Sequence, residues 1–131
     1  MTRIIQVVAA LIRDETGRLL TVRKAGTSAF MLPGGKPEPG EDEIPALARE
    51  LEEELGCRLD AATAFGRFEA VAANEPDAVV RSSVYETTVC GEIAARAEIA
   101  ELLWITPASP PAVRLAPLLE TRMLPALRAR S

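Results

Sequence analysis

The sequence contains no histidine. This absence excludes the Ser-His-Asp and Cys-His catalytic arrangements, a histidine general base and nearly every catalytic zinc site. Any catalytic chemistry in this chain must therefore use carboxylates, lysine, arginine, tyrosine or a hard metal cation.

Cysteines and long apolar runs are also scarce. The two cysteines, Cys57 and Cys90, cannot form a disulfide framework and provide no Cys-x-x-Cys pair for zinc, so we expect a reducing, cytoplasmic environment. No run approaches the ~20 consecutive apolar residues that cross a bilayer. The apolar stretch near the N-terminus lacks a small-residue cleavage site, and we expect a strand of the mature fold there. These features predict a soluble protein with no membrane partner.

A chain of 131 residues has the usual size of one domain, and it is long enough to bury roughly two thirds of its unfolded surface around one core. Hydrophobic residues make up 48% of the chain and charged residues 26%, as in average globular proteins. We therefore expect a single domain over residues 1–131.

The net charge of −4 is spread unevenly. Residues 35–57 contain eight acidic side chains but only two basic ones, Lys36 and Arg49, so this segment carries −6 and the remainder +2. Without a cation, such a patch repels nucleic acid polymers, free phosphates and anionic membranes. With a bound cation, it would attract phosphates.

The local patterns predict an α/β fold. Two strands joined by a turn are expected over residues 4–24, a helix from residue 41 or 42 to 55, and two long strands over residues 58–71 and 79–90. The remaining expected elements are a brief strand at residues 30–32, a polar loop or helical turn at 92–101, a short buried strand at 102–106, and a terminal helix at 115–129 interrupted at Pro125. This order suggests layers of helix around a mixed sheet.

Glutamates crowd the expected central helix. At about 100° per residue, Glu50, Glu53 and Glu54 fall along the edge of the buried stripe, while Glu52 points to the far side. Like charges at this spacing cost a few tenths of a kcal/mol per pair, and a bound cation would offset that cost. Arg49 precedes Glu53 by four residues and is placed to pair with it.

The spacing around these glutamates carries the strongest signal in the chain. It consists of Gly35, five residues, Glu41, seven residues, Arg49-Glu50-Leu51, one residue, Glu53-Glu54, one residue, Gly56 and Cys57. This pattern resembles the signature box of the Nudix hydrolases, and its one departure is cysteine at the final aliphatic position, where it packs as a small hydrophobe. Leu-Pro-Gly-Gly before the box and the segment over residues 98–104 also look like the family, so the resemblance covers almost the whole chain.

The resemblance implies a Nudix-like α/β/α sandwich with a mixed sheet, a central box helix and a C-terminal helix. It also implies Mg²⁺-dependent hydrolysis of a phosphoanhydride bond in a nucleoside diphosphate linked to a group X, with Mn²⁺ as the alternative metal. The compact length favours a small substrate such as a (d)NTP, including an oxidised one. Dimers are frequent in the family, and residues 79–89 are the segment considered for pairing two copies.

Each matching position then acquires an expected role. Glu50, Glu53 and Glu54 would be metal ligands together with the Gly34 carbonyl, and Glu50 or Glu53 would serve as general base. Arg49 would orient a glutamate. The remaining candidates are Glu41 supporting the loop or a further metal, Gly35 approaching the substrate, Glu98 as an extra ligand or base, Arg23 and Lys24 on phosphates, and Phe30 and Tyr85 stacking on a base.

Other readings of these residues remain open. Glu98 can equally be an ordinary loop charge, Arg23 and Lys24 can be strand-end charges, and Phe30 and Tyr85 can belong to the core. At the level of function, the alternatives are a non-catalytic Nudix-like module that binds a nucleotide or a partner, and a hydrolase of ADP-ribose or another nucleotide conjugate. ADP-ribose is disfavoured because Ala72 stands where ADP-ribose pyrophosphatases tend to carry proline.

Overall fold

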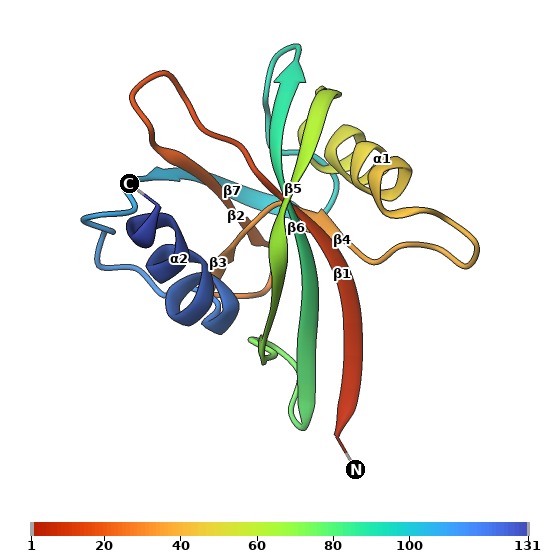
Figure 1. Cartoon of the computed structure of the whole chain (residues 1–131), viewed down its shortest axis with the longest axis vertical. Helices are drawn as coiled ribbons and strands as arrows, with labels where there is room; N and C mark the ends of the chain where they lie inside the picture. Colours follow the sequence, from red (N-terminus) through yellow and green to blue (C-terminus); the bar gives the residue numbers. More distant parts are fainter. Residues whose placement is uncertain (1, 131) are drawn as a thin grey trace.

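The computed structural model describes residues 2–130, and Figure 1 shows how its elements are arranged. In chain order they are β1 (Arg3–Leu11), β2 (Leu19–Lys24), β3 (Phe30–Met31), β4 (Gly34–Gly35), α1 (Glu43–Leu55), β5 (Arg58–Val71), β6 (Ala78–Cys90), β7 (Ile99–Ile105), the π-helical turn η1 (Leu118–Met123) and α2 (Leu124–Ala129). Among these described residues, no helix combines the length and apolarity needed to cross a membrane.

The strands of residues 2–130 form two sheets. The first has the order β4-β1-β6-β5 and is mixed, because β1 runs parallel to β6 while β1–β4 and β5–β6 are antiparallel pairs. The second has the order β3-β2-β7 and is antiparallel. The strands expected at residues 58–71 and 79–90 are confirmed as β5 and β6.

Alternate residues of β1 face opposite sides of the first sheet. Val8 and Ala10 pack in the core beneath α1, whereas Ala9 and Leu11 pack in a second core beneath η1 and α2. Accordingly, α1 and α2 lie on opposite sides of the strands in Figure 1. This arrangement confirms the α/β/α sandwich with a mixed sheet, a central helix and a C-terminal helix.

The central helix begins and ends close to its predicted limits. Asp42 is the N-cap residue, and Pro45 lies in the first turn, where a missing N–H costs little. Gly56 ends the helix in the left-handed conformation, with φ of 73°, and its N–H donates to the Glu52 carbonyl. The Arg96 guanidinium lies so close to Gly56 that a β-carbon at this position would overlap it.

The expected hairpin over residues 4–24 is only partly correct. Its turn is present, because the Asp14 carboxylate accepts a hydrogen bond of 2.9 Å from the Arg18 backbone N–H. The Leu20 N–H also donates to the Ile12 carbonyl. Beyond this point the prediction of a continuous hairpin was wrong, since β1 leaves to pair with β6 while β2 pairs with β7 in the other sheet.

Two further boundaries differ from those expected. β7 begins at Ile99, within the segment expected to be loop, because its first residues pair with the end of β2. The terminal helix begins at Leu118 rather than at residue 115, and its first part is a π-helical turn in which the Leu124 N–H donates to the Leu119 carbonyl. The interruption therefore falls just before Pro125, which has no N–H to donate.

The segment considered for dimerisation lies inside a sheet. Residues 79–89 belong to β6, and both edges of β6 are occupied, one by β1 and the other by β5. Edge-to-edge pairing of this segment with a second copy is therefore excluded. Dimerisation through another surface stays a prediction.

Two hydroxyl groups of β6 hold the start of α1 against the sheet. Ser83 Oγ and the Tyr85 hydroxyl each donate a hydrogen bond of 2.6 Å to the Glu43 carboxylate. These hydrogen bonds lower the pKa of Glu43 below its ordinary value of 4.5, and the bond from Ser83 has the larger effect. A half-buried anion thus joins α1 to the strand beneath it.

Replacing Glu43 should therefore destabilise the fold in a pH-dependent way. Glu43→Ala leaves two hydroxyls without their acceptor, and we expect a loss of about 1–2 kcal/mol in the free energy of unfolding near neutral pH. Because the folded-state pKa is lowered, this contribution is present above the unfolded-state pKa and is lost as the pH falls through the folded-state pKa. Urea unfolding of wild type and variant across this acid range measures it.

The exposed Glu52 supplies the control for that experiment. Glu52→Ala removes a carboxylate from the same helix without removing a hydrogen bond to the sheet, and its effect should stay within about 0.5 kcal/mol. An equal loss from both variants would show that Glu43 acts only through helix charge.

Candidate functional site

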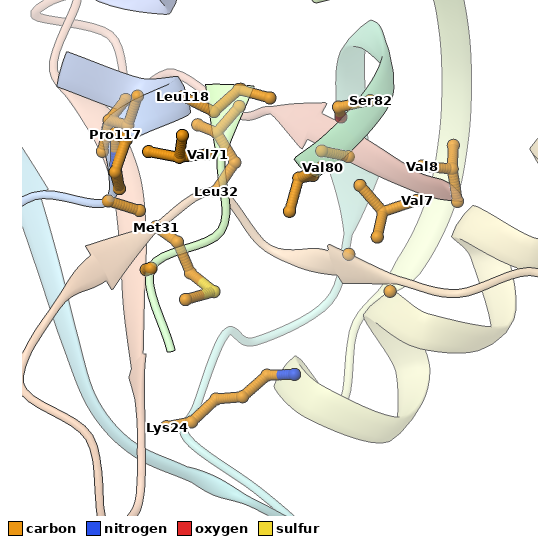
Figure 2. Close-up of a pocket in the computed structure, with 16 residues that line it drawn as sticks. Val7, Val8, Lys24, Met31, Leu32, Val71, Val80, Ser82, Pro117 and Leu118 are labelled. Atoms are coloured by element: carbon orange, nitrogen blue, oxygen red, sulfur yellow. The ribbon is translucent and has the colours of Figure 1, made fainter. Parts of the chain in front are cut away.

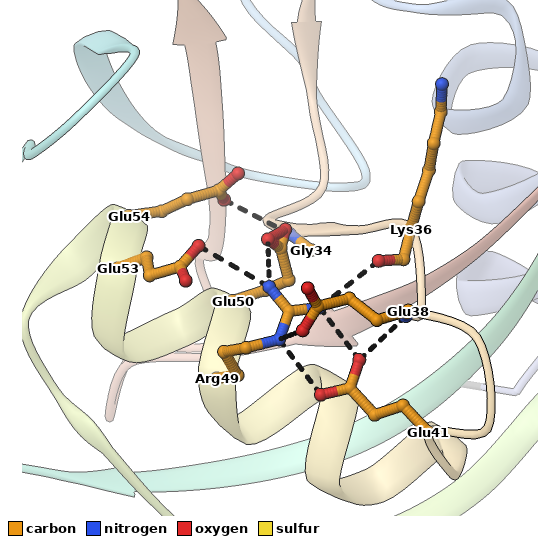
Figure 3. Close-up of polar contacts among 8 residues, drawn as sticks. All are labelled: Gly34, Lys36, Glu38, Glu41, Arg49, Glu50, Glu53 and Glu54. Atoms are coloured by element: carbon orange, nitrogen blue, oxygen red, sulfur yellow. Dashed lines mark hydrogen bonds and ion pairs between the residues drawn. The ribbon is translucent and has the colours of Figure 1, made fainter.

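Arg49 is the centre of an ion-pair network at the box helix (Figure 3). Its Nε and Nη2 atoms each donate to the Glu41 carboxylate at 2.9 Å, and Nη2 also donates to the Lys36 carbonyl at 3.2 Å. Nη1 donates to Glu50 at 3.1 Å and to Glu53 at 3.5 Å. The hydrogen bonds from Arg49 lower the pKa of Glu41 to about 2. Arg49 therefore joins the loop before α1 to the glutamates on it.

Glu54 is the most buried of the box glutamates. Only 8% of its surface is exposed, and one of its oxygens accepts a hydrogen bond of 3.3 Å from the Gly34 N–H. Burial raises the pKa of Glu54 to about 7, and the nearby Glu50 carboxylate adds to the rise. Burial also raises the pKa of Glu50, which Arg49 and Lys24 partly oppose. Both carboxylates thus lie where a positive charge would be favourable.

The glycine turn brings backbone directly against these carboxylates. Gly34 and Gly35 form β4, which pairs with Ala9 and Val8 of β1. A β-carbon on Gly34, whose φ is 149°, would overlap the Val8 carbonyl oxygen, and one on Gly35 would overlap the Glu50 carboxylate. No side chain fits between the sheet edge and α1, so the expected close approach at Gly35 is to Glu50.

The donor set suits a hard divalent cation. Glu50, Glu53 and Glu54 offer carboxylate oxygens from one side of α1, and Gly34 lies beside them, which is the ligand chemistry that Mg²⁺ and Mn²⁺ prefer. In residues 2–130, no three acidic, cysteine or histidine side chains yet converge as a preformed metal centre. One reason is the position of Glu53, whose side chain is 54% exposed and pairs with Arg49 instead of converging with the other two carboxylates.

The weaker candidates divide into two groups. Glu98 lies near the box, because its charge contributes to the raised pKa of Glu54. Arg23 instead donates to Glu101 at 3.1 Å and to the Thr27 carbonyl at 2.9 Å. The neighbouring Lys24 lies near the box glutamates, because its charge opposes the rise in the pKa of Glu50 and Glu54. The register of β2 with β7 shifts between Arg23 and Lys24.

The two aromatic candidates both make contacts within the fold. Phe30 is buried in the core beneath η1 and α2. Tyr85 lies on the α1 side of the sheet and donates its hydroxyl to Glu43. Neither side chain lines the pocket next to the glycine turn.

That pocket was not foreseen from the sequence. It opens beside Gly34 and Gly35 and is enclosed by β1, β6, the end of β5 and residues 116–119 (Figure 2). Its walls are aliphatic, with Lys24 reaching toward α1 at one end and Ser82 at the other. The available signal was the alternation of β6, which places Ser82 between Val80 and Val84 on one face.

Neutralising Glu54 should stabilise the metal-free protein at alkaline pH. Its folded-state pKa of about 7 lies above the ordinary value of 4.5, so its stability contribution is present below the unfolded-state pKa and is lost as pH rises through about 7. We expect the stability of Glu54→Gln to decrease less than that of wild type as the pH rises. At about pH 8 the variant should be as stable as wild type or more stable. Thermal unfolding in EDTA between about pH 5 and pH 8 measures it.

Glu52→Gln, on the exposed side of α1, is the matched control and should keep the wild-type profile. A Glu54→Gln variant clearly less stable than wild type at the alkaline end would contradict a net cost of burying this charge.

Comparisons with known proteins agree with this geometry. The NUDIX domain model matches residues 3–127. An 8-oxo-dGTP diphosphatase of Haemophilus influenzae is 44% identical over 71 residues, which are 51% of this chain and only 52% of that relative. The solution structure of the E. coli ORF135 protein has a TM-score of 0.73 at 29% identity, covering 98% of this chain and 91% of that one. A MutT NUDIX hydrolase from Burkholderia pseudomallei has a TM-score of 0.72 at 25% identity, covering 93% and 95%. The chain therefore belongs to the Nudix family.

Proposed function

We propose that this protein hydrolyses a phosphoanhydride bond in a nucleoside diphosphate linked to a group X, with Mg²⁺ as cofactor and a (d)NTP, oxidised guanine nucleotides included, as substrate. Proteins of the family generally use divalent cations. The observation that carries the proposal is the contact between two sites: the box carboxylates and the aliphatic pocket meet at Gly34 and Gly35, which border both. The Haemophilus relative's name supports the oxidised nucleotide.

The residues present divide the work by their positions. Glu50, Glu53 and Glu54 would hold the cation with the Gly34 carbonyl, and Glu98, whose charge acts on Glu54, would be a further ligand. When bound, the cation would offset the charge of the phosphates and make water more acidic.

Two further residues would orient the substrate and accept a proton. Lys24 lies between the box and the pocket and is placed to bind a phosphate oxygen. Of the two candidate bases, the Glu53 side chain is 54% exposed and in contact with solvent, whereas the Glu50 side chain is only 14% exposed. We therefore propose Glu53 as the group that accepts a proton from water. Arg49 holds both carboxylates in place.

A panel of nucleotides with Mg²⁺ tests the activity. It should include the four dNTPs, 8-oxo-dGTP and ADP-ribose, with Mn²⁺ in a parallel series, and pyrophosphate and orthophosphate release should be scored separately. We expect turnover of at least one nucleoside triphosphate, with ADP-ribose cleaved more slowly. Tight nucleotide binding without any product would instead favour a non-catalytic binding module, and the enzyme proposal would then be wrong.

Removing single charges from the box should separate catalysis from folding. The cation contributes several kcal/mol to a transition state of this kind, so we expect Glu53→Gln and Glu54→Gln to lower kcat by about a hundredfold to a thousandfold. Both should also weaken Mg²⁺ binding while thermal stability is held or raised, because repulsion between like charges is relieved. Glu52→Gln serves as control, and wild-type rates in the two box variants would refute the ligand assignments.

A further inference from the structure

One buried hydroxyl in the pocket has no partner. Only 1% of the surface of Ser82 is exposed, and Ser82 Oγ is the one buried side-chain polar atom of residues 2–130 without a hydrogen bond. Buried polar groups are nearly always paired, because leaving one unpaired costs stability. An unpaired hydroxyl inside a pocket therefore points to a group supplied from outside the chain.

The strand register directs this hydroxyl into the pocket. Ser82 shares the face of β6 with Val80 and Val84, on the side of η1 and α2, and it lines the pocket together with Val80. Ser83 faces the other way and donates to Glu43 beneath α1. Two adjacent serines thus have different environments: Ser83 has a hydrogen-bond partner within the fold, and Ser82, at the pocket wall, has none.

The lining of the pocket limits what it can receive. Among the described residues around it, Lys24 is the only charged side chain and Ser82 the only uncharged side chain with a hydrogen-bonding group; the others are aliphatic, glycine, proline or methionine. A sugar or phosphate inserted beside Ser82 would leave most of its polar groups unpaired. A nucleobase has apolar faces and a few polar atoms on its edge, which matches aliphatic walls with one hydroxyl.

The two ends of the pocket also set a direction. Lys24 lies toward α1 and the box, while Ser82 lies at the opposite end (Figure 2). A nucleotide bound with its phosphates near Lys24 and Gly35 would carry its base toward Ser82. A hydroxyl both donates and accepts, so it can bond either a carbonyl or an amino group on the base edge.

We propose that Ser82 Oγ hydrogen-bonds the edge of the substrate's nucleobase and so determines base-dependent affinity. This inference rests on the proposed nucleotide substrate, but it concerns binding and does not require hydrolysis.

Kinetics of Ser82→Ala and Ser83→Ala provide the first test. Losing one hydrogen bond to the base should raise KM for dGTP and dATP about tenfold in Ser82→Ala, with kcat within about twofold, because the contact is made equally in ground and transition states. Tripolyphosphate, which has no base, should inhibit wild type and Ser82→Ala equally. Ser83→Ala, which loses a bond outside the pocket, should keep the wild-type KM. An unchanged KM in Ser82→Ala for every nucleotide turned over would overturn the inference and leave the hydrolase proposal standing.

Binding and stability measurements remain decisive if no nucleotide is hydrolysed. Calorimetry with dGMP, dAMP, dCMP and dTMP in Mg²⁺ should show binding to wild type and an approximately tenfold weaker Kd for Ser82→Ala. Ser82→Ala should also hold or raise the Tm of the ligand-free protein, since it removes an unpaired hydroxyl, whereas Ser83→Ala should lower it. Absence of monophosphate binding to wild type, or equal binding to both proteins, would overturn the assignment.

Discussion

The structure depends on the burial of two carboxylates, Glu50 and Glu54, between α1 and the glycine turn. Burial raises the pKa of both groups, that of Glu54 to about 7. Their charged forms are therefore tolerated only with compensating partners. The Gly34 N–H is one partner of Glu54, and Arg49 is the partner of Glu50. A side chain at Gly35 would displace the Glu50 carboxylate, and one at Gly34 would overlap the Val8 carbonyl of the sheet. The glycine turn and the glutamates of α1 are therefore packed directly against each other.

The sheet connects this arrangement to the pocket. Ser83 and Tyr85 of β6 hold the start of α1 through Glu43, while Ser82, next to Ser83 and on the opposite face, lines the pocket. Because side chains alternate along a strand, one segment of β6 both positions the glutamate helix and forms the wall that a base would contact. The distance between the two sites is therefore set by a rigid element rather than by a loop.

Local parts of this arrangement were predictable from the sequence and long-range parts were not. The helix limits at Asp42 and Gly56 follow from capping and spacing within one segment. The separation of β1 from β2 depends on pairing with strands more than sixty residues away, which no local pattern reports. The partner of Arg23 is likewise Glu101 on another strand. The pocket combines short pieces of several elements, so its lining emerges only when the chain is folded.

Three features that cost stability coincide at this junction: like charges crowded on α1, a buried carboxylate whose pKa is raised by burial, and a buried hydroxyl without a partner. Sequences that specify a fold usually avoid such local conflicts, and where they are kept, function is the usual reason. A cation would offset the first two, and a polar group on a base would satisfy the third. All three costs are reduced by one kind of ligand, a metal-bound nucleotide, and no ligand with only phosphates or only a base would reduce them all.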